Sequence, residues 1–423
     1  MLGRVGGDFG RMGLVRPAGH LAGASLDLNF VASSGYPAAP SLLLTTTRSS
    51  SGDYADNSAG VWSSFAANIP RITDKGLLVE EARTNSIRNN SMQGAGAGSP
   101  GTLPTNWFVA NLRGLTQTVV GTGTSRGIEY VDVRFSGTTN ATSTLNFFFE
   151  ANSTIAAVEA QSWTHSVFVA IVGGSTANLT GMTINTAAYD AVPTYLSEVF
   201  TPVTIAGASA TLARFTGTGS APTSTAWIVP YIQLTFNNAV AIDITLRVGW
   251  PQLELGAFAT SPIRTTAAAA TRAADVVVGP AVSVGSALTL FAEMTAGDGA
   301  AAVQAAFQVD NGSTTDRVFL WRSGTALNGN VRNSSVDTAA LAGGAIANNA
   351  TGKMAIAVAA NDAAFCPNGG TVLTDATVTF PSGLNRVVFG QNGASGVTLN
   401  GYLRRVAYFP TRLTNAQLQA LTA

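Results

Sequence analysis

The side chains with the clearest chemical potential lie in the sequence DRVFLWRSG. Sugar rings present apolar C–H patches edged by hydroxyls, so a glycan site needs aromatic faces beside hydrogen-bonding groups. If Val318 and Leu320 point into a core, then Arg317, Phe319 and Trp321 form an outward stripe that could stack on a sugar. In the reverse register the two aromatic rings are ordinary core, which is the favoured interpretation because large aromatic side chains usually supply burial. The stripe is nevertheless the candidate glycan site.

The carboxylates do not form a pattern for glycoside hydrolysis. That reaction needs two carboxyl groups facing one cleft, and no Glu-x-Asp-x-x-Glu run exists in the chain. Glu80 and Glu81 are adjacent, so in a strand they would face opposite ways. The remaining candidates stand singly next to turns or at a linker, where Asp commonly initiates a turn: Glu293, Asp310, Asp316, Asp362 and Asp275. We therefore predict no catalytic residue and no enzyme.

Metal ligands and nucleophiles are equally sparse, and we predict no metal and no cofactor. His20 and His165 are the two histidines and Cys366 is the single cysteine, so neither a disulfide framework nor a thiolate site can form within one chain. We expect His165 to be a satisfied, semi-buried strand residue and Cys366 to be a small buried hydrophobe. The loop from Asp310 to Asp316 has oxygen ligands that could hold calcium, but it lacks EF-hand spacing, which favours a hairpin loop.

Composition favours an all-β chain. Among 423 residues only 11% are charged, 23 Lys+Arg balance 23 Asp+Glu, and glycine contributes 45 residues. Such a bias is typical of many short strands joined by turns. The zero formal net charge argues against a nucleic-acid partner. No apolar run approaches 18 residues, so we also expect no membrane insertion and no signal peptide.

The positions of turns and linkers predict an extended N-terminal anchor, two β-sandwiches of jelly-roll type and one short C-terminal helix. The domains are residues 1–92, an arm and anchoring region, then 104–262 and 275–423, with linkers at 93–104 and 264–274. Strand-like runs recur through both sandwiches; the alternation is clearest at 242–248, where Ile242 and its alternate neighbours share one face. Thr414 and Gln417 have capping-box spacing, which predicts a closing helix packed on the last sandwich.

Three segments carry a resemblance to phage virion fibre and tail proteins. GLLVEEARTNSIRNNS, residues 76–91, preceded by FAANIPRI at 65–72, resembles the end of their N-terminal module. Residues 250–275, WPQLELGAFATSPIRTTAAAATRAAD, are similar to the end of their carbohydrate-binding-module-like jelly roll. Residues 401–421, GYLRRVAYFPTRLTNAQLQAL, look like the last strand and closing helix of a concanavalin/laminin-G-like sandwich. The resemblance implies a head or tail fibre at the particle surface.

The expected function is therefore structural: the N-terminal region docks on other virion proteins and the sandwiches adhere to a host cell-surface glycan. Arg4, Arg11 and Arg16 are the candidate residues for virion attachment. A glycan-degrading tail-associated enzyme and a bacterial lectin or adhesin are the alternatives. Because the apolar runs of residues 21–90 are too short to close a core in one copy, we expect neighbouring copies to complete it, and the resemblance implies a homotrimer. Removing residues 1 to about 92 should leave two soluble sandwiches.

Overall fold

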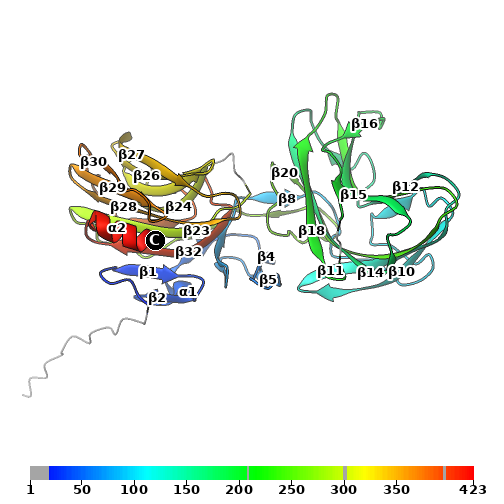
Figure 1. Cartoon of the computed structure of the whole chain (residues 1–423), viewed down its shortest axis with the longest axis horizontal. Coiled ribbons are helices and arrows are strands. Elements are labelled where there is room, and N and C mark those ends of the chain that lie inside the picture. The colour runs from blue at the N-terminus through cyan, green and yellow to red at the C-terminus, as the bar shows by residue number, and fades with distance from the viewer. Residues whose placement is uncertain (1–18, 207–208, 299–302, 394–396) are drawn as a thin grey trace, which may run out of the picture.

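The computed structural model describes residues 19–206, 209–298, 303–393 and 397–423. Their secondary structure is almost entirely β, from β1 to β32, with the two helices α1 (Pro40–Leu43) and α2 (Asn415–Thr422). The strands form two sandwiches that follow each other along the long axis, and smaller sheets lie between them (Figure 1). The expected all-β fold with two sandwiches and a closing helix is confirmed. Neither described helix is long and apolar enough to span a bilayer.

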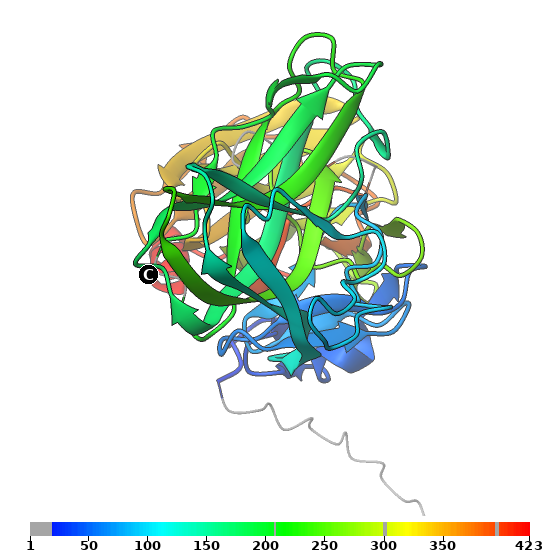
Figure 2. The same cartoon turned by 90° about the vertical axis from the view of Figure 1, so that its right-hand side faces the viewer.

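The central sandwich consists of two antiparallel sheets. The five-stranded sheet has the order β10 (Leu115–Ser125), β11 (Ile128–Thr138), β20 (Ala241–Leu255), β14 (Ser162–Ser175) and β18 (Ala213–Ser220). The seven-stranded sheet has the order β16 (Tyr195–Glu198), β15 (Leu179–Tyr189), β19 (Trp227–Phe236), β12 (Ser143–Phe148) and β9 (Phe108–Ala110), with β13 (Ile155–Ala156) on β19 and β17 (Val203–Thr204) on β15. Figure 2 shows this sandwich in front of the other one.

Alternating residues form the core of the central sandwich. In β20, Ile242, Ile244, Leu246 and Val248 are buried, whereas Asp243 on the opposite face is exposed, which confirms the predicted alternation. His165 lies in β14 and is fully buried, with Nδ1 3.0 Å from the Asn185 carbonyl oxygen. Burial lowers the pKa of His165 to about 4, so the ring is neutral at pH 7.

The C-terminal sandwich also has two sheets. The nine-stranded sheet has the order β2 (Ser34–Tyr36), β1 (Leu26–Asn29), β32 (Gly401–Phe409), β23 (Ala287–Thr295), β28 (Thr351–Ala359), β29 (Asp362–Pro367) and β30 (Leu373–Asp375), with β7 (Gly76–Val79) on β32 and β6 (Arg71–Thr73) on β7. The seven-stranded sheet has the order β27 (Val336–Ala345), β26 (Ala326–Asn333), β25 (Arg317–Ser323), β24 (Val303–Asp310), β31 (Arg386–Phe389), β22 (Val276–Val278) and β3 (Thr45–Thr47).

Residues 19–79 find their partners within their own chain. β1 pairs with β32, β3 pairs with β22, and Leu26, Leu28 and Phe30 are buried in the core of the C-terminal sandwich. The argument that neighbouring copies must complete this core is therefore wrong, because sheet pairing joins segments about 380 residues apart, Leu26 opposite Tyr408 for example. Deleting residues 1–92 would remove five strands from the C-terminal sandwich, namely β1, β2, β3, β6 and β7. This topology therefore does not support the prediction that the deletion leaves two soluble sandwiches.

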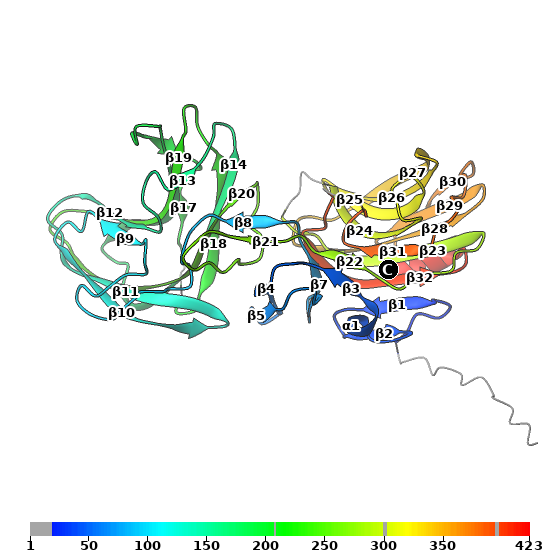
Figure 3. The ribbon, with the colours of Figure 1, turned by 180° about the vertical axis from the view of Figure 1, so that it is seen from behind.

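The two predicted linkers are joined to strands. β21 (Ala270–Arg272) pairs with β8 (Arg83–Asn85), and Thr265 and Arg272 are buried, so residues 264–274 form neither a helical turn nor a free spacer. Residues 93–104 are irregular as expected, but Gly98 forms a bridge to Val119 of β10. A further small sheet, β4 (Asp53–Asp56) with β5 (Trp62–Phe65), lies between the sandwiches (Figure 3).

Helix α2 begins as the sequence predicts. The Thr414 hydroxyl accepts a hydrogen bond from the Gln417 amide at 3.3 Å, and the Gln417 side chain accepts one from the Thr414 amide at 2.8 Å. Leu418 is buried against Cys366, Phe291 and neighbouring alanines of the nine-stranded sheet. Both the packing of the helix and the role of Cys366 as a small buried hydrophobe are confirmed.

Candidate glycan-binding faces

The register of β25 places the predicted stripe on the outer face of its sheet. Val318 and Leu320 are fully buried in the core, so Arg317, Phe319 and Trp321 point the other way. The favoured interpretation of these aromatics as core holds for Phe319 only in its burial, at 3% exposure, and is wrong for Trp321, because the alternation of β25 places Val318 and Leu320 in the core between the sheets. The Phe319 and Trp321 rings are parallel, with centroids 6.2 Å apart, and the Arg317 guanidinium lies 4.9 Å from the Phe319 centroid.

Polar side chains border this C-terminal face, which we define as Arg317, Phe319, Trp321, Gln308 and Asn330. Gln308 and Asn330 lie opposite Phe319 on the neighbouring strands β24 and β26. Phe319 itself is only 3% exposed, whereas Trp321 and Arg317 are half-buried. The Asn330 Oδ1 and Arg317 Nε atoms are buried without a hydrogen-bond partner. Trp321 and Arg317 are therefore the parts of this face that a sugar could contact, whereas Phe319 and the two unsatisfied atoms are buried.

A second aromatic surface, which the sequence analysis missed, covers the outer face of the seven-stranded sheet in the central sandwich. Phe108, Phe148 and Tyr231 lie side by side on β9, β12 and β19. The ring centroids of Phe108 and Phe148 are 4.9 Å apart, with an interplanar angle of 20°. Those of Phe148 and Tyr231 are also 4.9 Å apart, with an angle of 33°. We call this surface the central face, and it also includes Glu198 and Tyr195 of β16. Phe108 is 39% exposed and Tyr195 is 53% exposed.

Glu198 lies at the end of this aromatic row. Its Oε1 accepts hydrogen bonds from the Tyr231 hydroxyl at 2.6 Å and from the Tyr195 hydroxyl at 3.4 Å, while Oε2 is buried without a partner. Burial raises the pKa of Glu198 above its usual value, despite these hydrogen bonds. Burial and the adjacent carboxylate likewise raise the pKa of Tyr231. The row therefore ends in a strong hydrogen-bond acceptor that the protein satisfies only in part.

A weak signal for the central face was present in the sequence. In β12, Leu145 and Phe147 alternate with Asn146 and Phe148, so one of the consecutive phenylalanines has to face outward. From the sequence we interpret the tryptophans other than Trp321 as core residues. Trp107, Trp163 and Trp250 are buried, which confirms that interpretation for them, but Trp62 and Trp227 are half-buried. Nothing in the sequence shows which outward residues meet, because that depends on the register between strands.

Three of the single carboxylates of the C-terminal sandwich are paired with arginines, whereas Asp316 accepts hydrogen bonds from Asn311, Thr315 and Ser334. Glu293 bonds to Arg404 at 2.9 Å and Asp362 bonds to Arg412 at 2.7 Å. Asp310 is fully buried and accepts two hydrogen bonds from Arg386, at 2.7 and 3.0 Å. The loop that follows Asp310 connects the β24–β25 hairpin, as expected. Within the described residues no cluster of His, Cys, Asp and Glu has the grouping of a metal site. Arg4, Arg11 and Arg16 lie outside the described residues.

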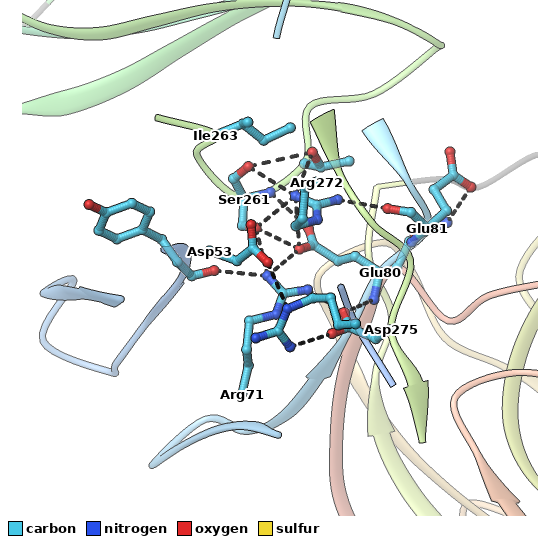
Figure 4. Close-up of polar contacts among 12 residues, drawn as sticks. Asp53, Arg71, Glu80, Glu81, Ser261, Ile263, Arg272 and Asp275 are labelled. Carbon is cyan, nitrogen blue, oxygen red and sulfur yellow. Dashed lines mark hydrogen bonds and ion pairs between the residues drawn. The ribbon is translucent and has the colours of Figure 1, made fainter. Parts of the chain in front are cut away.

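Buried ion pairs connect the two sandwiches, and we call this group the junction network (Figure 4). Asp275 bonds to Arg48 at 2.9 Å and to Arg71, and Glu80 pairs with Arg71 at 2.8 Å and with Arg272 at 3.3 Å. The network contains three arginines and three carboxylates, each less than 6% exposed: Arg48, Arg71, Arg272, Asp53, Glu80 and Asp275. Its charges are therefore balanced within the buried group.

The environment of Glu80 keeps it ionised. Burial opposes ionisation, but Arg272, Arg71 and hydrogen bonds from Ser261 lower the pKa of Glu80 to about 2. Ser261 follows β20 of the central sandwich and donates to Glu80 from both its amide, at 2.7 Å, and its hydroxyl, at 2.6 Å. Glu81 faces away and bonds to Arg83, so the two glutamates do not act as a catalytic pair in this arrangement.

No protein-family model matches the chain, and no curated protein matches it. Among solved structures, a Ruminococcus gnavus IT-sialidase CBM40 bound to α2,6-sialyllactose shares 17% identity, over 33% of this chain and 85% of that one, with a TM-score of 0.29. The CBM22-1–CBM22-2 tandem domain of Paenibacillus barcinonensis Xyn10C shares 9% identity, over 76% of this chain and 99% of that one, with a TM-score of 0.25. Because these TM-scores are low, the fold and the candidate faces rest on the described strands and side chains alone.

Proposed function

We propose that this protein is a non-enzymatic adhesion protein that binds host-surface glycans through the outer faces of its sandwiches. The observation that carries the proposal is that Phe108 and Tyr195 are the two aromatic residues among the exposed large hydrophobic side chains of the described chain. Both belong to the central face, where Glu198 supplies a hydrogen-bond acceptor. They lie on the opposite edge strands β9 and β16, and the rings of Phe148 and Tyr231 lie between them, so aromatic side chains cross this sheet face, as suits an interaction site. The C-terminal face offers the half-buried Trp321 and Arg317 as a second, less exposed surface of this kind.

The proposed setting is the surface of a phage particle, as part of a head or tail fibre. The support for this is the resemblance of residues 65–91, 250–275 and 401–421 to fibre and tail proteins. Docking on other virion proteins is proposed for the arm with Arg4, Arg11 and Arg16, since residues 19–79 bond within their own chain. The homotrimer remains part of this proposal and now rests on the resemblance alone.

A screen of the purified full chain against neutral and acidic glycans tests the binding function. The double variant Phe108→Ala, Tyr195→Ala should weaken binding of the best glycan about tenfold or more, because each ring contributes apolar contact area. Val336→Ala is the matched control, since Val336 is 63% exposed on the C-terminal sandwich outside both faces. No binding to any glycan, or equal binding by the double variant, would contradict the proposal.

Deletion of residues 1–18 tests whether the arm docks the protein on a phage particle. The shortened chain keeps every described strand, so it should fold and bind glycan like the full chain while failing to join particles. If the shortened chain joined phage particles at normal occupancy, the arm would have no docking role.

A further inference from the structure

A cleft of about 500 Å³ lies between the two sandwiches. Arg126, Phe168 and Arg214 line it from the central sandwich, Trp62 and Lys75 from the segment between the sandwiches, and Asp298 and Tyr402 from the C-terminal sandwich. A volume of this size accommodates a small saccharide, because ligand pockets usually span about 300–1,000 Å³. The cleft is separate from both aromatic faces and shares none of their residues.

Two of the three cations in the cleft have no carboxylate partner. Lys75 Nζ lies 3.0 Å from both carboxylate oxygens of Asp56, so its charge is compensated. Arg214 donates only to neutral groups, from Nη1 to the Thr260 carbonyl and from Nη2 to the Ser166 hydroxyl, each at 2.8 Å. Arg126 is exposed, and its guanidinium has no ion pair among the described residues.

Three carboxylates also line the cleft, and none of them forms an ion pair with Arg126 or Arg214 among the described residues. Asp56 is held by Lys75 and by the Tyr402 hydroxyl at 2.5 Å. Glu80 belongs to the junction network, and Asp298 accepts a hydrogen bond from the Asn349 amide at 2.6 Å on the opposite wall. Burial lowers the pKa of Arg214, although attraction by Glu254, Glu80, Asp56 and Asp298 opposes the shift. An anion that entered the cleft would offset the cost of burying this charge.

Next to Arg214, aromatic and aliphatic side chains form an apolar wall of the cleft. The Arg214 guanidinium lies 5.6 Å from the Phe168 ring centroid, and the Phe168 ring meets Trp62 edge to face at 6.1 Å. Leu212 and Ile128 are buried in the same cluster. A ligand that has both an anionic group and an apolar ring face therefore matches this wall.

We propose that the cleft between the sandwiches binds a carboxylated sugar, with Arg126 and Arg214 holding the carboxylate and Trp62 and Phe168 contacting the ring. The proposal extends the proposed glycan-binding function to a third site and specifies the class of sugar. It rests on that function only for the choice of a saccharide as the ligand.

Calorimetric titration of the full chain with sodium glucuronate tests this site, with glucose as the neutral comparison. Wild-type protein should bind glucuronate, and glucose should bind at least about tenfold more weakly because it lacks the charge. Arg126→Gln and Arg214→Gln should each weaken glucuronate binding by a similar factor. Arg134→Gln is the matched control, since Arg134 pairs with the exposed Asp243 on the five-stranded sheet of the central sandwich.

The outcomes separate this site from the aromatic faces. Arg126→Gln removes no described ion pair or hydrogen bond of the guanidinium, so this variant should keep the wild-type unfolding free energy, which denaturant unfolding checks. Phe108→Ala, Tyr195→Ala should leave glucuronate binding unchanged. Equal binding of glucose and glucuronate, or wild-type glucuronate binding in Arg126→Gln, would overturn the proposal. Inorganic phosphate that binds as tightly as glucuronate would overturn the assignment of a sugar.

Discussion

Two glutamates in different regions show how differently this protein uses buried charge. Glu80 in the junction network faces two arginines and Ser261, and its pKa falls to about 2. Glu198 on the central face has tyrosine hydroxyls but no cationic partner, and burial raises its pKa. Each junction carboxylate faces an arginine, so removing one partner leaves a buried charge uncompensated, although Arg71 Nε and Arg272 Nε have no hydrogen-bond partner. Glu198 faces tyrosine hydroxyls and no arginine, and it lies beside exposed aromatic side chains. The comparison separates a structural role for the junction from the binding role proposed for the faces.

The largest expected effect is at the centre of the junction network. Asp275→Asn removes the charge that faces Arg48 and Arg71, so it should lower the free energy of unfolding by about 3–5 kcal/mol. Asp243→Asn is the control, because the Asp243–Arg134 pair is exposed and should contribute less than about 1 kcal/mol. Denaturant unfolding measures both. Equal effects in the two variants would show that the junction is no more important than a surface ion pair.

The second largest effect is the pH dependence of the unfolding free energy that Glu80 confers. Because its folded-state pKa is lowered from 4.5 to about 2, its stabilisation is fully present above pH 4.5 and is lost as the pH falls through that window. The loss should amount to roughly 3 kcal/mol. In Glu80→Gln the unfolding free energy should be lower at pH 7 and should change less between pH 4.5 and pH 2. Parallel pH profiles for the variant and the wild type would contradict this account.

A smaller effect distinguishes the two faces from each other. Trp321→Ala should weaken glycan binding at the C-terminal face by about tenfold and change the unfolding free energy little, because Trp321 is half-buried outside the core. Binding at the central face should not change. If the unfolding free energy falls as much as for a core aromatic, about 3–5 kcal/mol, the stripe is packing rather than a site.

The smallest effect is expected at Glu198. Its raised pKa means that the protonated form favours the folded state, and that contribution is lost as the pH rises above 4.5 through the raised value. Glu198→Gln should therefore become more stable relative to wild type as the pH rises. Glu159→Gln, at an exposed position, is the control and should show no such trend. If the wild type instead became more stable relative to Glu198→Gln as the pH rises, the pKa of Glu198 would be lowered in the folded state, which contradicts this account.

The sequence predicts those features that depend on neighbouring residues. Alternation within β20 and the capping box of α2 are local, so the buried positions of β20 and the first residue of α2 could be predicted. The apolar alternation of β15, β26 and β27 is weak because glycine, threonine and alanine interrupt it, so these strands do not stand out in the sequence. The run ATVTF at 376–380 resembles a strand but forms none among the described residues.

Features that depend on distant segments could not be predicted. Leu28 of β1 pairs with Val406, so the core partner of the leader lies at the other end of the chain. The central face brings Phe108, Phe148 and Tyr231 together from three strands whose register no single segment encodes. The outward position of Phe319 and Trp321 was one of two possible registers, and packing of Val318 and Leu320 in the core decides between them.

The most direct test measures glycan affinity and unfolding free energy together in Phe108→Ala, Tyr195→Ala and in Asp275→Asn. The first variant should lose about tenfold or more in affinity and change the unfolding free energy by less than about 1 kcal/mol. The second should lose about 3–5 kcal/mol in stability and retain wild-type affinity under conditions where it is folded. A loss of affinity in Asp275→Asn equal to that in the face variant, or an unchanged affinity in the face variant, would contradict the division between a structural junction and binding faces.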